Sequence, residues 1–244
     1  MHLQWRSLGT ARDRVRLESQ DGALAHGWLT VTPSRALGTT LPDSDFRSLC
    51  RYLLGLPLTQ DGAAAKCPAC GDACDPLGDH SVNCGKNGIT RRHNAVRDEW
   101  SRTLSAASIP HAKEVVATGL KRPADILLIG WHRGRDVCVD FTICNPIAAD
   151  NFPLKPGMGK QHLSLAEREK IRKEGPLCAQ AAWGFHPAAL SPWSCMGPAA
   201  KWLLHDTLKK ITPDLTLAAH SARIQEIKQN ISITLAREVA RQLK

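Results

Sequence analysis

Cysteine and histidine residues lie at metal-ligand spacing in one short stretch of the chain. Cys67 and Cys70 form a CxxC pair, and His80 and Cys84 complete the pattern C-x2-C-x9-H-x3-C. Thiolate and imidazole ligands at this spacing can close a tetrahedron around Zn²⁺. Because four protein ligands leave no open coordination position, the pattern predicts a structural zinc site that holds a basic surface against nucleic acid. Cys74 is a substitute ligand that the spacing leaves open.

Two aspartates occupy a second stretch, RPADILLIGWHRGRDVCVDFTI, which covers residues 122–143. Its two apolar, β-branched runs predict strands, and the HRGR between them predicts a hairpin turn. A turn centred between residues 133 and 134 sets Thr142 opposite Asp125, with Asp125 and Asp140 on one face and their Cβ atoms about 7–8 Å apart. Carboxylates this close raise each other's pKa unless a divalent cation lies between them, so the pair predicts a Mg²⁺ or Mn²⁺ site. The alternative is that Asp125 ends a turn and Asp140 is a solvated strand residue.

A helix is predicted over residues 89–107, where apolar residues recur at near-3.6 spacing. Its arginines, Arg91, Arg92 and Arg97, either form a solvated face or contact phosphates. His93 falls on the apolar stripe, so the expected role is that of a hydrogen-bonded core histidine rather than a catalytic one.

Two more elements carry candidate residues. A strand over 113–117 bears Glu114, directly before the hairpin. The sequence Ser-Leu-Ala-Glu at 164–167 predicts a capping box that opens a helix. Lys170 and Lys173 lie on the same stripe of that helix as alanine and leucine, which makes one of them a candidate for reaching the carboxylate pair; a snorkelling lysine is the alternative.

The remaining elements are predicted from turn signals and apolar spacing. They are an extended segment over 27–33, a helix from 43 that ends near Gly55, a buried strand through 184–185, a helix from Pro198 and a last amphipathic helix that starts at 212–214.

The composition points to a polyanionic partner. The 244 residues carry a net charge of +9, and the pI is about 9.3. Such a balance suggests either nucleic acid or an anionic membrane surface, and of these we expect DNA, or also RNA, as the partner. No apolar run reaches the length of a membrane span, and the first residues lack the apolar core of a signal peptide. Nine cysteines are then expected to be reduced or metal-bound, so we expect a nuclear or cytoplasmic protein without a membrane partner, and a homodimer is left open.

The order of these features resembles a known arrangement: a zinc knuckle, an RRHNAVRD helix, a strand with a glutamate, RPAD, VDFT and a lysine-bearing helix. It is similar to the carboxy-terminal region of retrotransposons without long terminal repeats that encode a restriction-like endonuclease, as found in reverse-transcriptase-like proteins. In that family a CCHC knuckle precedes a PD-(D/E)xK nuclease domain. The resemblance covers about residues 27–204 and is strongest over 67–142.

The resemblance implies roles for individual residues. Asp125 in RPAD matches the Pro-Asp motif, Asp140 matches the second acidic motif, and Glu114 matches an upstream acidic position as an outer-shell base or second-metal ligand. The lysine of the motif would fall at Thr142, so it must come from the next helix, where Lys170 fits best. Apart from the resemblance, the basic residues near the proposed site that we expect to contact nucleic acid are Arg91, Arg92, Arg97, Lys121, Arg122 and Lys173.

The predicted fold is α/β of the α+β kind, with a restriction-endonuclease-like core formed by a small mixed sheet flanked by helices. The predicted units are an N-terminal helical or linker region over 1–64, the CCHC zinc knuckle over 65–90, the endonuclease domain over 91–205 and a C-terminal amphipathic helix over 206–244.

Two functions are consistent with the sequence. The first is a Mg²⁺- or Mn²⁺-dependent DNA endonuclease, and the second is a catalytically inert, zinc-dependent nucleic-acid-binding relic of a retrotransposon protein. Reverse transcription itself has no candidate site, because no Asp-Asp pair occurs in the chain. A name taken from reverse transcriptase would therefore describe the parent of this chain.

Overall fold

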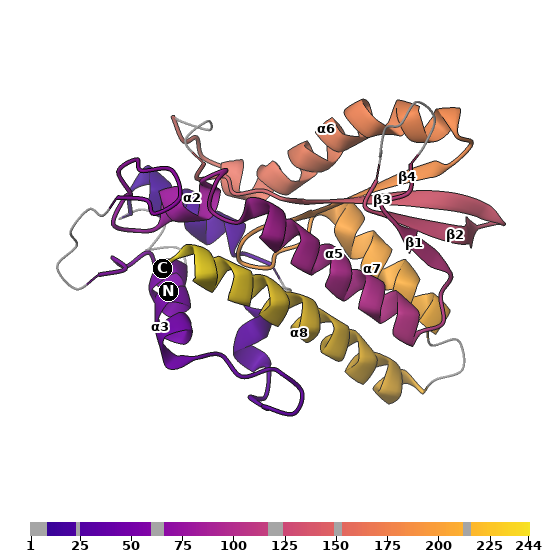
Figure 1. Cartoon of the computed structure of the whole chain (residues 1–244), viewed down its shortest axis with the longest axis horizontal. Helices are drawn as coiled ribbons and strands as arrows, with labels where there is room; N and C mark the ends of the chain where they lie inside the picture. Colours follow the sequence, from indigo (N-terminus) through magenta and orange to yellow (C-terminus); the bar gives the residue numbers. More distant parts are fainter. Residues whose placement is uncertain (1–8, 23–24, 60–65, 117–123, 149–152, 212–215) are drawn as a thin grey trace.

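The four strands form one mixed sheet. In this computed structural model they are β1 (His111–Lys113), β2 (Ile126–His132), β3 (Arg135–Ile143) and β4 (Gly184–Leu190), in the spatial order β1-β2-β3-β4 (Figure 1). The first three strands pair antiparallel, and β4 lies parallel to β3. The predicted mixed α and β architecture is therefore confirmed. The structure describes residues 9–22, 25–59, 66–116, 124–148, 153–211 and 216–244.

Helices cover both faces of the sheet. Helix α6 (Met158–Gln180) connects β3 to β4 and lies on one face, whereas α5 (Ile89–Ala106) and α7 (Pro198–Ile211) pack on the other (Figure 1). Helix α8 (Leu217–Gln242) lies outside this second layer, against α5. A parallel pair of strands needs such a crossover, and α6 supplies it.

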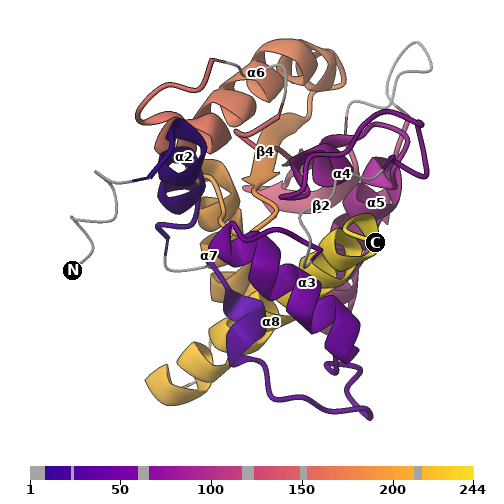
Figure 2. The ribbon, with the colours of Figure 1, turned by 90° about the vertical axis from the view of Figure 1, so that its left-hand side faces the viewer.

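The shorter elements gather at one end of the molecule. They are α2 (Ala11–Ser19), the 3-10 helix η1 (Gly27–Thr30), α3 (Asp43–Leu54) and α4 (Asp79–Asn83). Helix α3 crosses α8, as Figure 2 shows. Trp28 of η1 and Tyr52 of α3 belong to the same apolar core as Trp100 of α5. The core is thus continuous from the N-terminal segment through the sheet to α8.

The hairpin between β2 and β3 contains both a tight turn and a bulge. Arg133 and Gly134 have φ of 51° and 79°, as a two-residue turn that matches the strand twist requires. His132 pairs with Arg135 beside the turn, but further along Leu128 pairs with Val137, so β2 holds two extra residues between these pairs.

The bulge is built around Gly130, whose φ is 62°. Its N–H donates to Asp136 Oδ1 at 2.8 Å. Since the insertion is of two residues and side chains alternate with a period of two, each side chain keeps its face of the sheet. The predicted pairing of Asp125 with Thr142 is wrong by two residues, because the bulge shifts the partner of Ile126 to Val139.

Several predicted elements are confirmed, and others need correction. The helix predicted over 89–107 is α5, the helix ending near Gly55 is α3, the buried strand is β4, and the helix from Pro198 is α7. The segment 27–33 is not extended, because η1 occupies its first half. Helix α8 starts after Thr216, whose hydroxyl accepts from Ala219 N, and the predicted start at 212–214 lies outside the described residues.

The capping box predicted at 164–167 is wrong. Helix α6 begins earlier, at Met158, so Ser164 is inside it and its hydroxyl donates to Gln161 O at 2.9 Å. Glu167 is buried, and its carboxylate accepts from Ala199 N and Ala200 N at the start of α7, both at 3.1 Å. The glutamate therefore caps a different helix. None of the helices that the structure describes is long and apolar enough to cross a membrane.

Candidate metal centres

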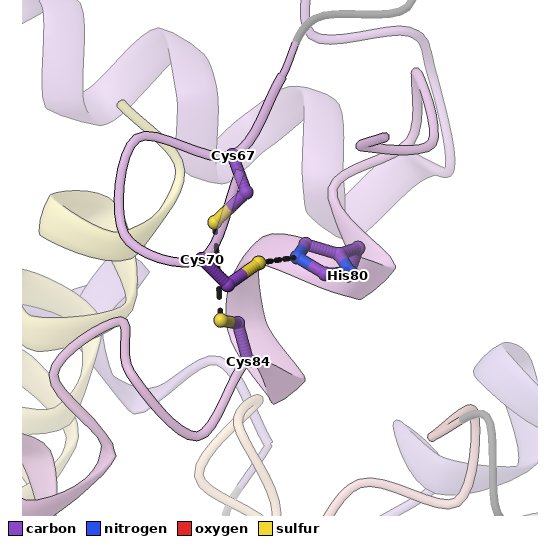
Figure 3. A group of neighbouring side chains, drawn as sticks. All are labelled: Cys67, Cys70, His80 and Cys84. Carbon is purple, nitrogen blue, oxygen red and sulfur yellow. Dashed lines mark hydrogen bonds between the residues drawn. The ribbon is translucent and has the colours of Figure 1, made fainter. Parts of the chain in front are cut away.

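The four predicted zinc ligands converge in the structure. One ligand atom from each of Cys67, Cys70, His80 and Cys84 lies within 4.8 Å of the others. Cys67 Sγ lies 3.8 Å from Cys84 Sγ, and Cys70 Sγ lies 3.2 Å from His80 Nε2. Figure 3 shows the four side chains pointing toward one another from the loop and from α4. Cys74 is not part of this set and instead accepts from Ser81 Oγ at 3.8 Å.

Local backbone geometry sets these ligands in place. Gly71, with φ of 86°, closes the CxxC turn by donating to Cys67 O at 2.9 Å. Asp75 caps the short helix that carries His80, accepting from His80 N at 2.6 Å. Gly78 precedes that helix with φ of 84°, and a Cβ there would lie 2.7 Å from Leu243. Position 78 therefore requires glycine for two reasons, its backbone conformation and the lack of space for a side chain.

The electrostatics of this Cys/His cluster favour a metal-binding thiolate. Burial raises the pKa of Cys67, but hydrogen bonds from the N–H groups of Cys70 and Ala69 outweigh it, so the pKa lies below that of a free cysteine. Three sulfurs and one imidazole nitrogen are the donor set of structural zinc sites, and the cluster is compatible with zinc.

The Cys/His cluster is joined to the core by a buried arginine. Val82, between the two last ligands, is fully buried in the main core. Arg92 of α5 donates to Val82 O at 3.0 Å and to Gln242 Oε1 of α8 at 2.8 Å, and only 2% of its surface is exposed. The prediction that Arg92 contacts nucleic acid is wrong, because its guanidinium ties three segments together inside the protein. Asn87 adds a bond to Gln242 O at 2.9 Å.

A second cluster lies where α5, β2 and β3 meet. Ligand atoms of His93, Asp125 and Asp140 lie within 4.8 Å of one another. Asp125 directly precedes β2, and since Ile126 pairs with Val139, Asp125 and Asp140 are the next residues opposite each other. Asp125 N donates to Val139 O at 2.9 Å. The two carboxylates therefore share one face of the sheet, as the sequence predicted, but stand directly opposite rather than diagonal.

His93 reaches this cluster from α5. It lies two helical turns before Trp100, whose ring packs 5.6 Å from that of Phe141 in β3. His93 Nε2 lies 3.1 Å from Asp125 Oδ2 and 3.2 Å from Phe141 O. His93 forms the hydrogen bonds that were expected of it, but its partner is the candidate metal-binding carboxylate rather than a group of the core, which the sequence did not reveal.

Lys170 reaches the carboxylate cluster from α6, on the face of the sheet opposite to α5. Cys138 in β3 and Cys178 in α6 pack together, so Asp140, two residues from Cys138, faces the same helix. Lys170 precedes Cys178 by about two helical turns and places Nζ 2.6 Å from Asp140 Oδ2. That oxygen is buried and has no hydrogen-bond partner of good geometry among the described residues, so the contact is an ion pair rather than a directed hydrogen bond.

The two carboxylates have unequal proton affinities. Burial, together with the nearby charge of Asp125, raises the pKa of Asp140 to about 6 although Lys170 acts in the opposite direction. Burial also acts on Asp125, but hydrogen bonds from His93 and from Phe141 N, which is 2.7 Å from Oδ2, lower its pKa. The same hydrogen bond to Asp125 raises the pKa of His93. A buried, incompletely satisfied carboxylate oxygen beside a second carboxylate and an imidazole could hold a divalent cation.

Glu114 does not join this cluster. Strand β1 ends at Lys113, before the strand predicted over 113–117, and Glu114 adopts φ of 50° directly after it. Its carboxylate forms an ion pair with Arg97 of α5. Arg97, which is 8% exposed, also pairs with Asp98 at 3.0 Å. Both predicted roles change, since Glu114 is no ligand of the cluster and Arg97 is neutralised by two carboxylates.

The other predicted nucleic-acid contacts are less constrained. Arg91 is exposed and pairs with Glu238 at 2.6 Å, and Lys173 is exposed and pairs with Glu169 at 3.2 Å. Lys121 and Arg122 lie outside the described residues.

A scan against protein-family models matches no family, and a search of curated proteins finds no similar protein.

Proposed function

We propose that this chain is a metal-dependent endonuclease that hydrolyses phosphodiester bonds in DNA. The observation that carries the proposal is the convergence of Asp125, Asp140 and Lys170 on one small mixed sheet. Two carboxylates on adjacent strands and a lysine from the following helix are the parts of the restriction-like nuclease core that the sequence resembles. His93 takes the position at Asp125 that the resemblance would give to Glu114.

The residues of this cluster divide the work of hydrolysis between them. Asp125 and Asp140 would hold Mg²⁺ or Mn²⁺, which supplies Lewis-acid chemistry by lowering the pKa of a bound water and stabilising charge on phosphate oxygens. His93 and Phe141 N fix the orientation of Asp125 through hydrogen bonds. Lys170 keeps Asp140 ionised and would place a positive charge where the phosphate gains negative charge in the transition state.

The Cys/His cluster has a separate, structural role in this proposal. It binds one Zn²⁺ through four protein ligands, which leaves no position for a substrate. Its contacts with α5 through Arg92 and Val82 transmit that stability to the helix that carries His93.

Nicking of supercoiled plasmid in the presence of Mg²⁺ or Mn²⁺ tests the proposal. Asp140→Asn should reduce nicking by about a thousandfold, since a metal ligand contributes several kcal/mol of transition-state stabilisation. A matched control is Asp43→Asn, which removes an exposed carboxylate from the first turn of α3 and should leave nicking unchanged. Absence of nicking by the zinc-loaded wild-type protein, with DNA binding retained, would instead support the inert nucleic-acid-binding relic.

A further inference from the structure

A second concave surface lies at the end of the sheet where the hairpin turns and β4 begins. It encloses about 830 Å³, more than the 680 Å³ pocket beside the Cys/His cluster. Aromatic rings dominate its walls. They come from four different elements or connections: Trp131 of β2, Trp183 before β4, Phe185 of β4 and Trp202 of α7. We refer to it as the aromatic pocket.

Trp202 is the aromatic residue of the pocket with the largest exposed surface for a ligand to contact. About half of its surface is exposed, which is unusual for a tryptophan at the edge of a packed helix layer. Its ring lies 4.9 Å from the ring of His186, and His186 Nε2 is held 2.7 Å from Ala199 O. The indole is therefore presented in a fixed orientation with much of its surface open to solvent.

Two non-glycine residues near the aromatic pocket have positive φ. Ala182, in the connection between α6 and β4, has φ of 58° and ends α6, since Trp183 N donates back to Cys178 O at 3.0 Å. This ending places Trp183 on the wall. Arg133, with φ of 51°, belongs to the hairpin turn described above.

Three cationic side chains lie at or near the rim, which also includes one carboxylate, that of Asp136, whose Oδ1 accepts from Gly130 N at 2.8 Å. Arg133 and Arg135 are exposed, and neither forms an ion pair with any residue that the structure describes, unlike Arg91 and Arg97 of α5. Lys210 of α7 adds a third cation, with Nζ 4.6 Å from the centre of the Trp131 ring. Aromatic faces bordered by unpaired arginines can stack bases and neutralise phosphates at the same time.

We propose that the aromatic pocket binds an unpaired base of the nucleic acid strand whose backbone passes the carboxylate cluster. The inference rests on the proposed function, because it specifies the form of DNA that the same protein would take. Along β3, Arg135 and Asp140 are five residues apart, or about 17 Å at ~3.3 Å per residue. The line runs through buried residues of β3, so a strand that passes over the surface needs at least about five nucleotides at ~3.4 Å each. The preferred substrate is then DNA with a single-stranded segment at least about five nucleotides from the cut.

Fluorescence anisotropy without added Mg²⁺ or Mn²⁺ tests the inference independently of cleavage. The probes are a fluorescein-labelled 12-nucleotide single strand and a blunt duplex of the same sequence. Trp202→Ala should weaken binding of the single strand by about tenfold, because it removes a stacking surface, and should change duplex binding little. The control is Phe46→Ala, which removes an aromatic ring of similar exposure from α3 and should change neither affinity.

The outcomes separate this inference from the nuclease proposal. Equal loss for single strand and duplex, or no loss, would overturn the aromatic pocket as a base site. If Trp202→Ala does not fold, the decisive measurement is quenching of tryptophan fluorescence by the single strand. Trp202→Phe should reduce that quenching, and unchanged quenching would overturn the inference. If wild type nicks plasmid but Trp202→Ala binds the single strand as tightly as wild type, only the base site is overturned. If Trp202→Ala weakens single-strand binding but wild type does not nick plasmid, only the nuclease proposal is overturned.

Discussion

The Cys/His cluster and the carboxylate cluster of His93, Asp125 and Asp140 are built in opposite ways. The first draws its ligands from 18 consecutive residues, closes on itself and uses soft sulfur donors. The second combines a helix, the residue before one strand and the middle of the next, and it uses hard oxygen donors with one imidazole. Soft, closed sets suit structural zinc, whereas two neighbouring carboxylates, one with an oxygen held only by an ion pair, suit an ion that keeps positions for water and substrate.

The difference also separates stability from chemistry. Removal of a ligand from the closed set should disturb the fold, because the set is bonded to the core through Val82 and Arg92. Loss of a carboxylate from the open set should disturb the reaction and leave the fold in place, because those carboxylates are costly to bury and repel each other. The predictions below test this division from its largest consequence to its smallest.

Cys84→Ala should remove bound zinc and most of the stability of the protein. Metal binding to such a site is coupled to folding, and a domain has only about 5–15 kcal/mol of stability to lose. Elemental analysis should find one zinc per wild-type chain and none in the variant, whose melting temperature should fall sharply. The control is Cys74→Ala, which removes a neighbouring thiol outside the ligand set and should keep both the zinc and the fold. Full zinc content in Cys84→Ala would contradict the assignment of the ligands.

Lys170→Ala should reduce plasmid nicking by about a hundredfold, the cost of losing a preorganised positive charge at the reacting centre. Lys173→Ala is the matched control, since Lys173 lies on the same helix but pairs with the exposed Glu169. It should change nicking by less than about threefold. Zinc content and melting temperature should be nearly unchanged in both variants, in contrast to Cys84→Ala. Equal losses in the two variants would indicate that Lys170 acts only through general charge.

The sequence was sufficient for features that depend on the spacing of nearby residues or on the alternation of side chains along a strand. The Cys/His cluster was predictable because its ligands are close in sequence, and the shared face of Asp125 and Asp140 was predictable because strand alternation has a period of two. The two-residue bulge at Gly130 changed the register without changing the face. The stripe made Lys170 and Lys173 equal candidates, and only the family resemblance favoured Lys170, which is the one that contacts Asp140.

The failures concern partners that are distant in sequence. Glu167 looked like half of a local capping box, yet it caps α7, more than 30 residues later. Arg92 looked like a phosphate ligand, but folding brings Gln242 and Val82 to it. His93 was assigned to the core because it lies on an apolar stripe, and a stripe does not show which polar group meets it. Its neighbours in RRHNAVRD, rich in charge, were the one available signal.

The pH dependence of stability should reveal the raised pKa of Asp140. Because its pKa is about 6 in the folded protein and about 3.9 in an unfolded chain, the folded state binds the proton more tightly. The free energy of unfolding therefore falls as pH rises from about 4 to 6, and the raised pKa of His93 acts in the same sense. Without divalent cations other than zinc, urea unfolding should show wild type losing about 1–2 kcal/mol more than Asp140→Asn between pH 5 and 7. Parallel pH profiles would show that Asp140 is not perturbed.

Glu114→Gln should have the smallest effect, and it tests whether the carboxylate cluster extends beyond its three members. Glu114 is partly exposed and paired with Arg97, so its loss should cost little stability and change nicking by less than about threefold. Asp98→Asn is the control, because it removes the other carboxylate that pairs with Arg97. Both variants release the same guanidinium and should behave alike. A loss of nicking in Glu114→Gln as large as that in Lys170→Ala, with Asp98→Asn unaffected, would mean that Glu114 acts on the metal directly and that the cluster changes its arrangement when DNA binds.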